Sequence, residues 1–134
     1  MKIFIDTNIL VYAMDEDEPA KQTRCRELLA SLGNSSQGVI STQVLQETFV
    51  ATTRKLNVEP LKARAVLQSL QVLEIVTITS SLIFTAIECS HRDQLSFWDA
   101  LIITAAAHAK CETIWTEDLN AGQIIQGVHI VNPF

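Results

Sequence analysis

Short apolar segments alternate along the whole chain with longer segments of helical periodicity, and this alternation constrains the fold more than any other feature. Buried strands are predicted for the apolar and β-branched segments at residues 2–5, 38–40, 73–79, 112–115 and 127–131. Helices are predicted between them at residues 9–14, 20–32, 43–55, 61–70, 82–90 and 97–110. Because strands separated by helices pair in parallel, the pattern predicts an α/β fold with a central, mostly parallel sheet.

Length and composition favour one folded domain. The chain has 134 residues, of which 48% are hydrophobic and 19% charged, so residues 1–134 are expected to form a single domain with a buried core. The 15 acidic and 10 basic residues give a net charge of −5, which argues against binding nucleic acid through bulk positive charge. A nucleic-acid enzyme that neutralises its own carboxylates with metal ions stays compatible with this balance.

Cysteine usage and hydropathy favour a cytoplasmic protein. Cys25, Cys89 and Cys111 are odd in number, widely spaced and without a C-x-x-C pair, so they are expected to be reduced core thiols. Asp6 interrupts the apolar N-terminus before the core of a signal peptide could form. No segment reaches the roughly 18 uncharged apolar residues that a membrane span requires, so no membrane partner is expected.

Four acidic residues occupy positions that matter in an α/β sheet. Asp6 directly follows the first predicted strand, and Asp118 lies three residues past Trp115, at the end of the fourth. Both are expected at the carboxyl edge of the sheet, where ligands bind in open α/β folds. Glu47 and Asp99 lie in helical segments among apolar residues, and these segments hold no matching supply of basic side chains.

An acid in an apolar setting requires a partner, a proton or a metal ion. Four acids that converge without basic partners would repel one another and raise their own pKa values, and divalent cations remove this repulsion. Ligation by oxygen alone favours Mg²⁺ or Mn²⁺ over zinc, which prefers histidine and cysteine. None of the three histidines lies in the four acidic segments.

Each acid also has a structural explanation. Asp6 could cap the turn that follows it, and Glu47 could reach the surface from its helix. Asp99 stands three residues after Ser96, as in a capping pair, and Asp118 could be a first-turn acid favoured by a helix dipole. The pattern alone leaves these explanations open beside a shared metal site.

Four segments resemble, in order, the acidic motifs of PIN-domain ribonucleases. They are Phe4-Ile-Asp-Thr-Asn-Ile-Leu-Val-Tyr-Ala13, Thr42-Gln-Val-Leu-Gln-Glu-Thr48, Ser96-Phe-Trp-Asp-Ala-Leu-Ile102 and Thr116-Glu-Asp-Leu119. The tail from Gly122 to Phe134 is similar to that of small stand-alone toxins of the VapC group. The resemblance covers essentially the whole chain and implies a three-layer α/β/α fold with a central parallel sheet.

The resemblance also implies a site. Its metal-binding and catalytic residues would be Asp6, Glu47, Asp99 and Asp118. Thr116 would be the hydroxyl that accompanies the fourth acid, and Asn8 would form a hydrogen bond near Asp6 and hold its rotamer. Glu117 is adjacent to this site and is expected to point away from it.

The activity implied by the resemblance is Mg²⁺-dependent (or Mn²⁺-dependent) hydrolysis of RNA phosphodiester bonds, with 5′-phosphate and 3′-hydroxyl products. The chain would be the toxin of a type II toxin–antitoxin pair, with an antitoxin protein as its partner and RNA as its substrate. The same resemblance implies a homodimer. The sequence contains no Ser-His-Asp or Cys-His arrangement, and metal-assisted hydrolysis needs no nucleophilic side chain.

The substrate contacts are harder to derive from the sequence. Arg54 or Arg92 is expected to bind phosphate, because both lie near the ends of helices that carry or neighbour the acids. Lys21, Arg24 and Arg26 are expected to form a solvated helix face. Among the aromatic residues near the acids, Trp98 is expected to pack in the core rather than to stack on bases.

Two other functions stay open. A receiver-like or phosphatase-like α/β protein would use an aspartate at a strand end for phosphoryl transfer, although Glu47 and Asp99 have no role in such a protein. A non-catalytic partner-binding module on a PIN-like fold is the alternative from a different class.

Overall fold

The apolar segments of the sequence form one six-stranded sheet in the order β3-β2-β1-β4-β6-β5. The computed structural model describes all residues from Met1 to Phe134. Its elements are β1 (Lys2–Ile5), α1 (Thr7–Tyr12), α2 (Pro19–Ser31), β2 (Gln37–Ser41), α3 (Thr42–Arg54), α4 (Pro60–Ser69), the 3₁₀ turn η1 (Leu70–Val72), β3 (Glu74–Val76), α5 (Ser80–Asp93), α6 (Phe97–His108), β4 (Thr113–Trp115), β5 (Ile124–Ile125) and β6 (Val128–Val131).

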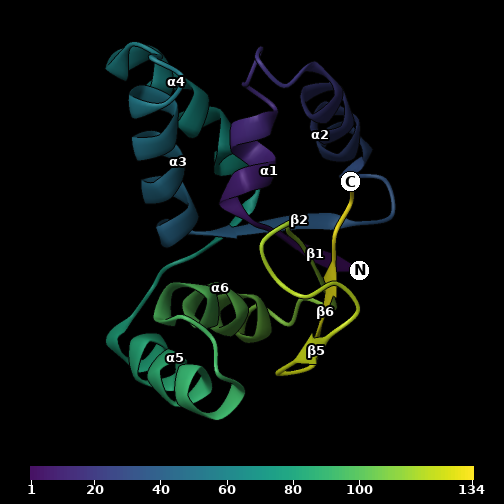
Figure 1. Cartoon of the computed structure of the whole chain (residues 1–134), viewed down its shortest axis with the longest axis vertical. Helices are drawn as coiled ribbons and strands as arrows, with labels where there is room; N and C mark the ends of the chain where they lie inside the picture. The colour runs from purple at the N-terminus through teal and green to yellow at the C-terminus, as the bar shows by residue number, and fades with distance from the viewer.

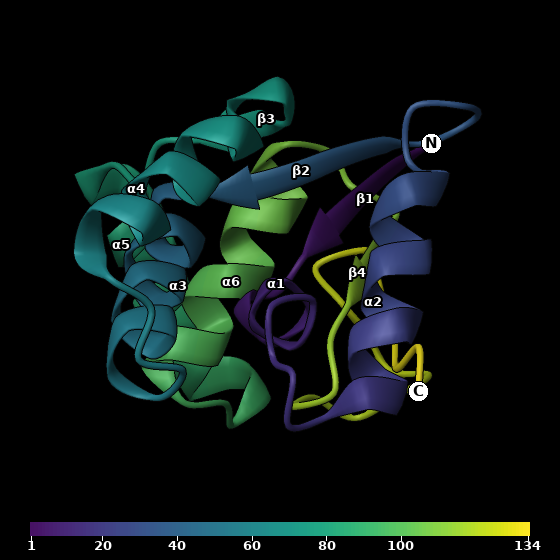
Figure 2. The ribbon, with the colours of Figure 1, turned by 90° about the horizontal axis from the view of Figure 1, so that it is seen from above.

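Helices cover both faces of the sheet. Helices α1 to α4 lie on one side of the strands, and α5 and α6 lie on the other (Figure 1). Seen from above, α1 lies between α2 and the α3–α4 pair (Figure 2). The predicted three-layer α/β/α fold is confirmed.

The central strands are parallel and buried on both faces. β1 pairs in parallel with β2 and with β4, and its residues Phe4 and Ile5 are fully buried. A parallel strand that is covered by helices on both sides needs apolar residues on both of its faces, and the three buried residues of β1, Ile3, Phe4 and Ile5, are all apolar. Seven residues of α6, from Ala100 to Ala106, are buried, because this helix packs between the sheet and α5.

Two features of the sheet differ from the prediction. β3 ends at Val76 rather than at Thr79, because the Ile78 amide donates to Thr42 Oγ1 (3.1 Å) and not to a neighbouring strand. β5 was not predicted and forms an antiparallel hairpin with β6. The two turn residues of this hairpin, Gln126 and Gly127, have φ values of 51° and 79°, the positive angles that short hairpin turns require.

The three cysteines are buried and unpaired, as expected from their spacing. They belong to one hydrophobic core of 27 buried residues, most of which come from the central strands and from α1, α2, α3, α5 and α6. No helix is both long enough and apolar enough to cross a membrane.

The strand order brings the ends of β1 and β4 together. The Asp6 amide donates to Trp115 O (3.1 Å), which extends the ladder by one residue past β1. The first turn of α3 follows β2 at the same edge, since Ser41 ends the strand and caps the helix. Residues that are far apart in the sequence therefore meet at the carboxyl edge of the sheet.

Candidate active site

Asp6 is buried at the end of β1 and is held by two hydrogen bonds. Its Oδ1 accepts from the Thr7 amide (2.7 Å), and its Oδ2 accepts from the Thr116 hydroxyl (2.7 Å). Burial raises the pKa of Asp6 to about 6, and the nearby charges of Asp118 and Glu47 act in the same direction. The two hydrogen bonds oppose this change, because they stabilise the charged carboxylate.

Glu47 approaches Asp6 from α3. Its Oε1 accepts from the Thr7 hydroxyl (2.8 Å), and its Oε2 accepts from Gln43 Nε2 (3.3 Å). Gln43 also donates to the backbone carbonyl of Trp98 (3.2 Å). The side chain of Gln43 therefore ties the helix that carries Glu47 to the first turn of α6, which carries Asp99.

Asp118 lies in the loop after β4, which we call the 116–118 loop (Thr116, Glu117 and Asp118). Its Oδ2 accepts from Asn8 Nδ2 (2.9 Å), and its amide donates to Thr116 Oγ1 (3.1 Å). Asn8 Nδ2 also lies 3.5 Å from Thr116 Oγ1. Asn8 thus contacts the fourth acid directly, and it reaches Asp6 only through Thr116.

Asp99 lies in the first turn of α6. Its amide donates to the Ser96 hydroxyl (3.1 Å), which is the capping contact expected from the sequence. Its carboxylate forms no hydrogen bond or ion pair with the rest of the chain and is half-buried. The capping contact uses the backbone of Asp99, so it leaves the carboxylate free for another role.

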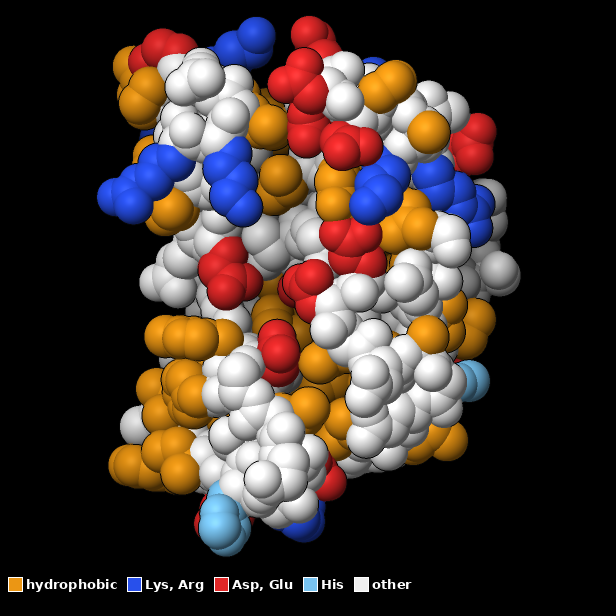
Figure 3. Space-filling model, in the orientation of Figure 1, with side chains coloured by type: hydrophobic (Ala, Val, Ile, Leu, Met, Phe, Trp, Pro, Cys, Tyr) orange, Lys and Arg blue, Asp and Glu red, His pale blue; other side chains and the backbone are white.

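All four acids line one open cleft of about 1100 Å³. Acidic side chains gather along the hollow across the middle of this face, with basic side chains on both flanks (Figure 3). Arg54 and Lys55 of the last turn of α3 also line the cleft. Arg92 does not, since it lies at the end of α5 and pairs with Asp93 (3.2 Å).

The chemistry of these donors fits a hard divalent cation. None of the four acids forms an ion pair with a basic side chain, and the groups that donate hydrogen bonds to their carboxylates are hydroxyl, backbone amide and side-chain amide groups. The buried oxygens Asn8 Oδ1 and Gln43 Oε1 have no hydrogen-bond partner. However, no three His, Cys, Asp or Glu side chains are placed closely enough to hold a metal ion together. Glu47 and Asp118 instead accept hydrogen bonds from Thr7 and Asn8.

Several residues of the cleft differ from the sequence-based expectation. Trp98 does not pack in the core: its side chain is 62% exposed and lines the cleft beside Asp99, so that prediction is wrong. The sequence analysis did not predict that Thr7 and Gln43 bind the carboxylate of Glu47. Gln43 precedes Glu47 by four residues and therefore shares its helix face, a signal that could have identified it.

The basic residues of α2 are two exposed arginines, Arg24 and Arg26, as expected for a solvated helix face, and the half-buried Lys21. Arg24 Nε donates to Pro133 O (2.9 Å), and Arg26 Nε donates to Ala13 O (2.8 Å). Lys21 forms an ion pair with Glu117 (3.0 Å). These contacts hold α2 against α1 and the C-terminal segment, a role that helical periodicity alone does not reveal.

Solved structures with the same fold include toxins and toxin–antitoxin complexes. A crystal structure of Mycobacterium tuberculosis VapC20, described as a Sarcin-Ricin loop cleaving toxin, is 21% identical, with a TM-score of 0.70 over 87% of this chain and 91% of that chain. A toxin–antitoxin complex from Klebsiella pneumoniae is 21% identical, with a TM-score of 0.72 over 98% of both chains. VapBC2 from Rickettsia felis, bound to a DNA fragment from its promoter, is 23% identical, with a TM-score of 0.67 over 97% of both chains.

At these identities the structural similarity shows the fold alone. No curated protein matches the sequence. The sequence profile of the PIN domain matches residues 3–124, which is most of the chain and includes all four acids. The chain therefore belongs to the PIN domain family.

Proposed function

We propose that the chain is a ribonuclease that depends on a divalent metal ion and acts as the toxin of a toxin–antitoxin pair. One observation carries the proposal: four carboxylates from four separate parts of the chain line one cleft, and none of them forms an ion pair with a basic side chain. Membership of the PIN domain family and structural similarity to a toxin described as cleaving the Sarcin-Ricin loop support it.

Asp6, Glu47, Asp99 and Asp118 would hold Mg²⁺ or Mn²⁺ and are the proposed catalytic residues. A bound divalent ion supplies a Lewis acid, which lowers the pKa of water and neutralises charge on the phosphate. Oxygen ligands of this kind suit Mg²⁺ and Mn²⁺ better than zinc.

The surrounding residues orient these carboxylates. Thr116 and the Thr7 amide hold the two oxygens of Asp6, while the Thr7 hydroxyl and Gln43 hold those of Glu47. Asn8 holds Asp118. Contacts of this kind stabilise the rotamers of metal-binding side chains, and their removal weakens both metal binding and activity.

Substrate binding is proposed for two residues at the edge of the cleft. Arg54 is exposed there and would contact phosphate, which gives affinity without sequence preference. Trp98 exposes an aromatic face beside Asp99 and would stack on an unpaired base. Arg92 lies outside the cleft, so the geometry supports Arg54 rather than Arg92.

An antitoxin protein is the proposed regulatory partner, since the Klebsiella pneumoniae structure is described as a toxin–antitoxin complex. The negative charge of the cleft would favour an inhibitor that inserts an arginine or lysine toward the carboxylates. A homodimer is proposed as well, and size-exclusion chromatography with light scattering would measure it.

The test is cleavage of a labelled mixed RNA pool by the purified chain with Mg²⁺, with Mn²⁺ and with EDTA. Asp6→Asn and Asp99→Asn are compared with Glu88→Gln, an exposed acid on α5 that is far from the cleft. We expect cleavage that requires metal, disappears in both aspartate variants and persists in Glu88→Gln. Tight partner binding by a chain that neither cleaves RNA nor gains thermal stability from Mn²⁺ would favour the non-catalytic binding module instead.

A further inference from the structure

The middle residue of the 116–118 loop is held differently from its two neighbours. Thr116 and Asp118 contact Asp6 and Asn8, whereas both carboxylate oxygens of Glu117 are bound by Tyr12 and Lys21. The Tyr12 hydroxyl donates to Glu117 Oε1 (2.5 Å), and Lys21 Nζ donates to Glu117 Oε2 (3.0 Å). Glu117 therefore turns toward α1 and α2 rather than toward the other acids, as the sequence analysis expected.

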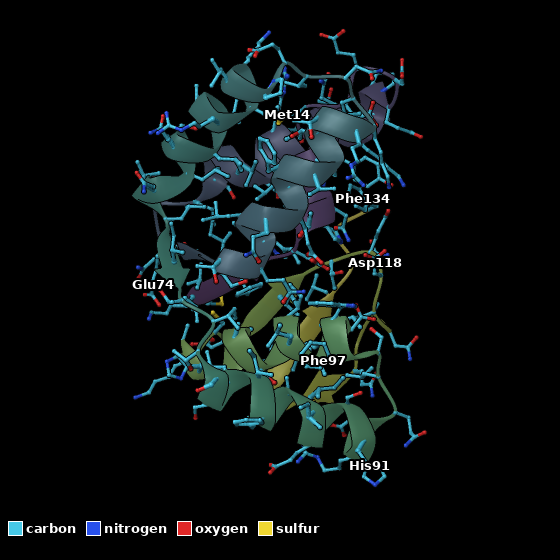
Figure 4. All side chains as sticks on the ribbon, turned by 90° about the vertical axis from the view of Figure 1, so that its left-hand side faces the viewer. Met14, Glu74, His91, Phe97, Asp118 and Phe134 are labelled. Atoms are coloured by element: carbon cyan, nitrogen blue, oxygen red, sulfur yellow. The ribbon has the colours of Figure 1, made fainter.

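Lys21 closes a compact cluster around Glu117. Its Nζ also donates to the Tyr12 hydroxyl (3.2 Å) and lies 4.5 Å from the centre of the Tyr12 ring. The ring of Phe134 packs edge-on against Tyr12 at 5.5 Å, and Lys21 Nζ lies 5.2 Å from its centre. Asp118 and Phe134 lie on the same side of the molecule, and Glu74 lies on the far side (Figure 4).

Two residues of α1 connect this cluster to the site. Asn8 and Tyr12 are four positions apart, so they share one face of the helix. The 116–118 loop lies along this face: Asn8 holds Asp118, and Tyr12 holds Glu117. A shift of the loop along α1 would therefore break both contacts together.

The surroundings of Glu117 also distinguish it from a fifth metal ligand. Burial raises its pKa, but the hydrogen bonds from Tyr12 and Lys21 outweigh burial and lower the pKa overall. An ammonium group beside a carboxylate competes with any cation for the same oxygens. Asp6, Glu47, Asp99 and Asp118 have no such basic neighbour.

We propose that Tyr12, Lys21 and Glu117 form a positioning clamp, which sets the register of the 116–118 loop so that Asp118 faces the cleft. The role of Asp118 rests on the function proposed above. Glu117 acts through Asp118 and Thr116 and does not bind the metal ion. The clamp joins the loop after β4 to α1 and α2, so the loop is anchored by residues from two other parts of the sequence.

A charge swap tests the clamp. Glu117→Lys places two ammonium groups in contact, and Lys21→Glu places two carboxylates in contact, while the double variant Lys21→Glu/Glu117→Lys restores opposite charges. A glutamate is also compatible with the first turn of α2, where residue 21 lies. Mn²⁺ affinity by electron paramagnetic resonance and amide hydrogen exchange of Asp118 are measured for all four proteins.

The chain offers a matched control. Lys2 and Glu74 form an ion pair at 2.8 Å with side chains 34% and 33% exposed, and the side chains of Lys21 and Glu117 are 35% and 23% exposed. Because Glu74 lies far from the 116–118 loop, Glu74→Lys should break an equivalent pair without changing Mn²⁺ affinity or exchange at Asp118.

We expect each single variant to weaken Mn²⁺ binding about tenfold, because removing a contact that orients a metal ligand has an effect of this size. Each should also speed amide exchange at Asp118 about tenfold. The double variant should recover most of the Mn²⁺ affinity and most of the protection of the Asp118 amide from exchange. If exchange recovers but Mn²⁺ binding does not, Glu117 is itself a ligand, and the proposal that it acts only by positioning Asp118 is wrong. Unchanged exchange in the single variants would also overturn it.

Two other outcomes, a variant that does not fold and a wild-type protein that does not bind Mn²⁺, can be distinguished from failure of the clamp. If Glu117→Lys does not fold, Tyr12→Phe removes the hydroxyl and keeps the ring against Phe134, and it should speed exchange at Asp118 less strongly but in the same direction. If the wild-type protein binds no Mn²⁺, the proposed metal-dependent function is wrong. The exchange rates would still decide whether the clamp positions the loop.

Discussion

The Thr116 hydroxyl donates to Asp6 Oδ2 at 2.7 Å, although the two residues are 110 positions apart in the sequence. The bond forms because β1 and β4 are parallel neighbours whose carboxyl ends coincide. It stabilises the charged form of Asp6 at a place where burial favours the neutral form. The protonation of Asp6 is thus set by a balance between burial and neighbouring negative charges on one side and the hydrogen bonds from Thr116 and the Thr7 amide on the other.

Replacing this hydroxyl should change the titration of Asp6. Thr116→Val removes a hydrogen bond to a charged group, worth roughly 1.5 kcal/mol or more, so the pKa of Asp6 should rise by about one unit above its value near 6. Carboxyl-carbon NMR titration would measure the shift. Thr85→Val, an exposed threonine on α5, is the control and should leave the Asp6 pKa unchanged.

Asp6 should also make the stability of the metal-free protein depend on pH. Its pKa is about 6 in the folded protein and 3.8 in the unfolded chain, so the folded state binds more protons between these values. Stability should therefore fall as pH rises from about 4 to about 6 and stay low above that range. The change in the free energy of unfolding is at most about 3 kcal/mol, from two pKa units.

Asp6→Asn removes this dependence. In EDTA at neutral pH the variant should be more stable than wild type by about 2 kcal/mol, and the difference should vanish below about pH 4. Denaturant unfolding at several pH values measures it. Wild-type stability that does not fall between about pH 4 and about pH 6, relative to the variant, would show that burial does not raise the Asp6 pKa.

Arg54 should contribute affinity for RNA without sequence preference. Arg54→Ala is expected to raise KM, to leave kcat nearly unchanged and to reduce the salt dependence of binding by about one phosphate contact. Arg64→Ala, an exposed arginine on α4 outside the cleft, serves as the control. Equal effects of the two substitutions would mean that only net charge matters.

Trp98 should favour RNA with unpaired bases. Loss of one stacked base costs about 1–3 kcal/mol, so Trp98→Ala should weaken binding of a single-stranded RNA by roughly fivefold or more, whereas Trp98→Phe should keep most of it. Phe84→Ala is a matched control, because Phe84 is 65% exposed on α5 and Trp98 is 62% exposed. Fluorescence anisotropy with a labelled oligonucleotide would compare the three variants in the presence of EDTA.

The alternation of strands and helices was sufficient to predict an α/β fold with a mostly parallel sheet and the place of Asp6 and Asp118 at one edge of this sheet. The three-layer arrangement was expected from the resemblance to PIN-domain ribonucleases. The α/β fold and the place of the two acids follow from local properties. Periodicity identifies each element, and parallel pairing then aligns the strand ends. The capping contact between Ser96 and Asp99 was equally local, since it spans three residues.

Other features depend on which elements become neighbours. Trp98 is exposed because the cleft, and not another helix, lies beside the first turn of α6. Arg54 lies at the end of α3 and Arg92 at the end of α5, but of these two helix ends only that of α3 lies at the cleft. Glu117 directly precedes Asp118 in the sequence, but its carboxylate is bound by Tyr12 and Lys21 and not by the residues around Asp118. A sequence pattern repeats along one element and determines its type and buried face, whereas the partner of each side chain is set by packing between distant elements.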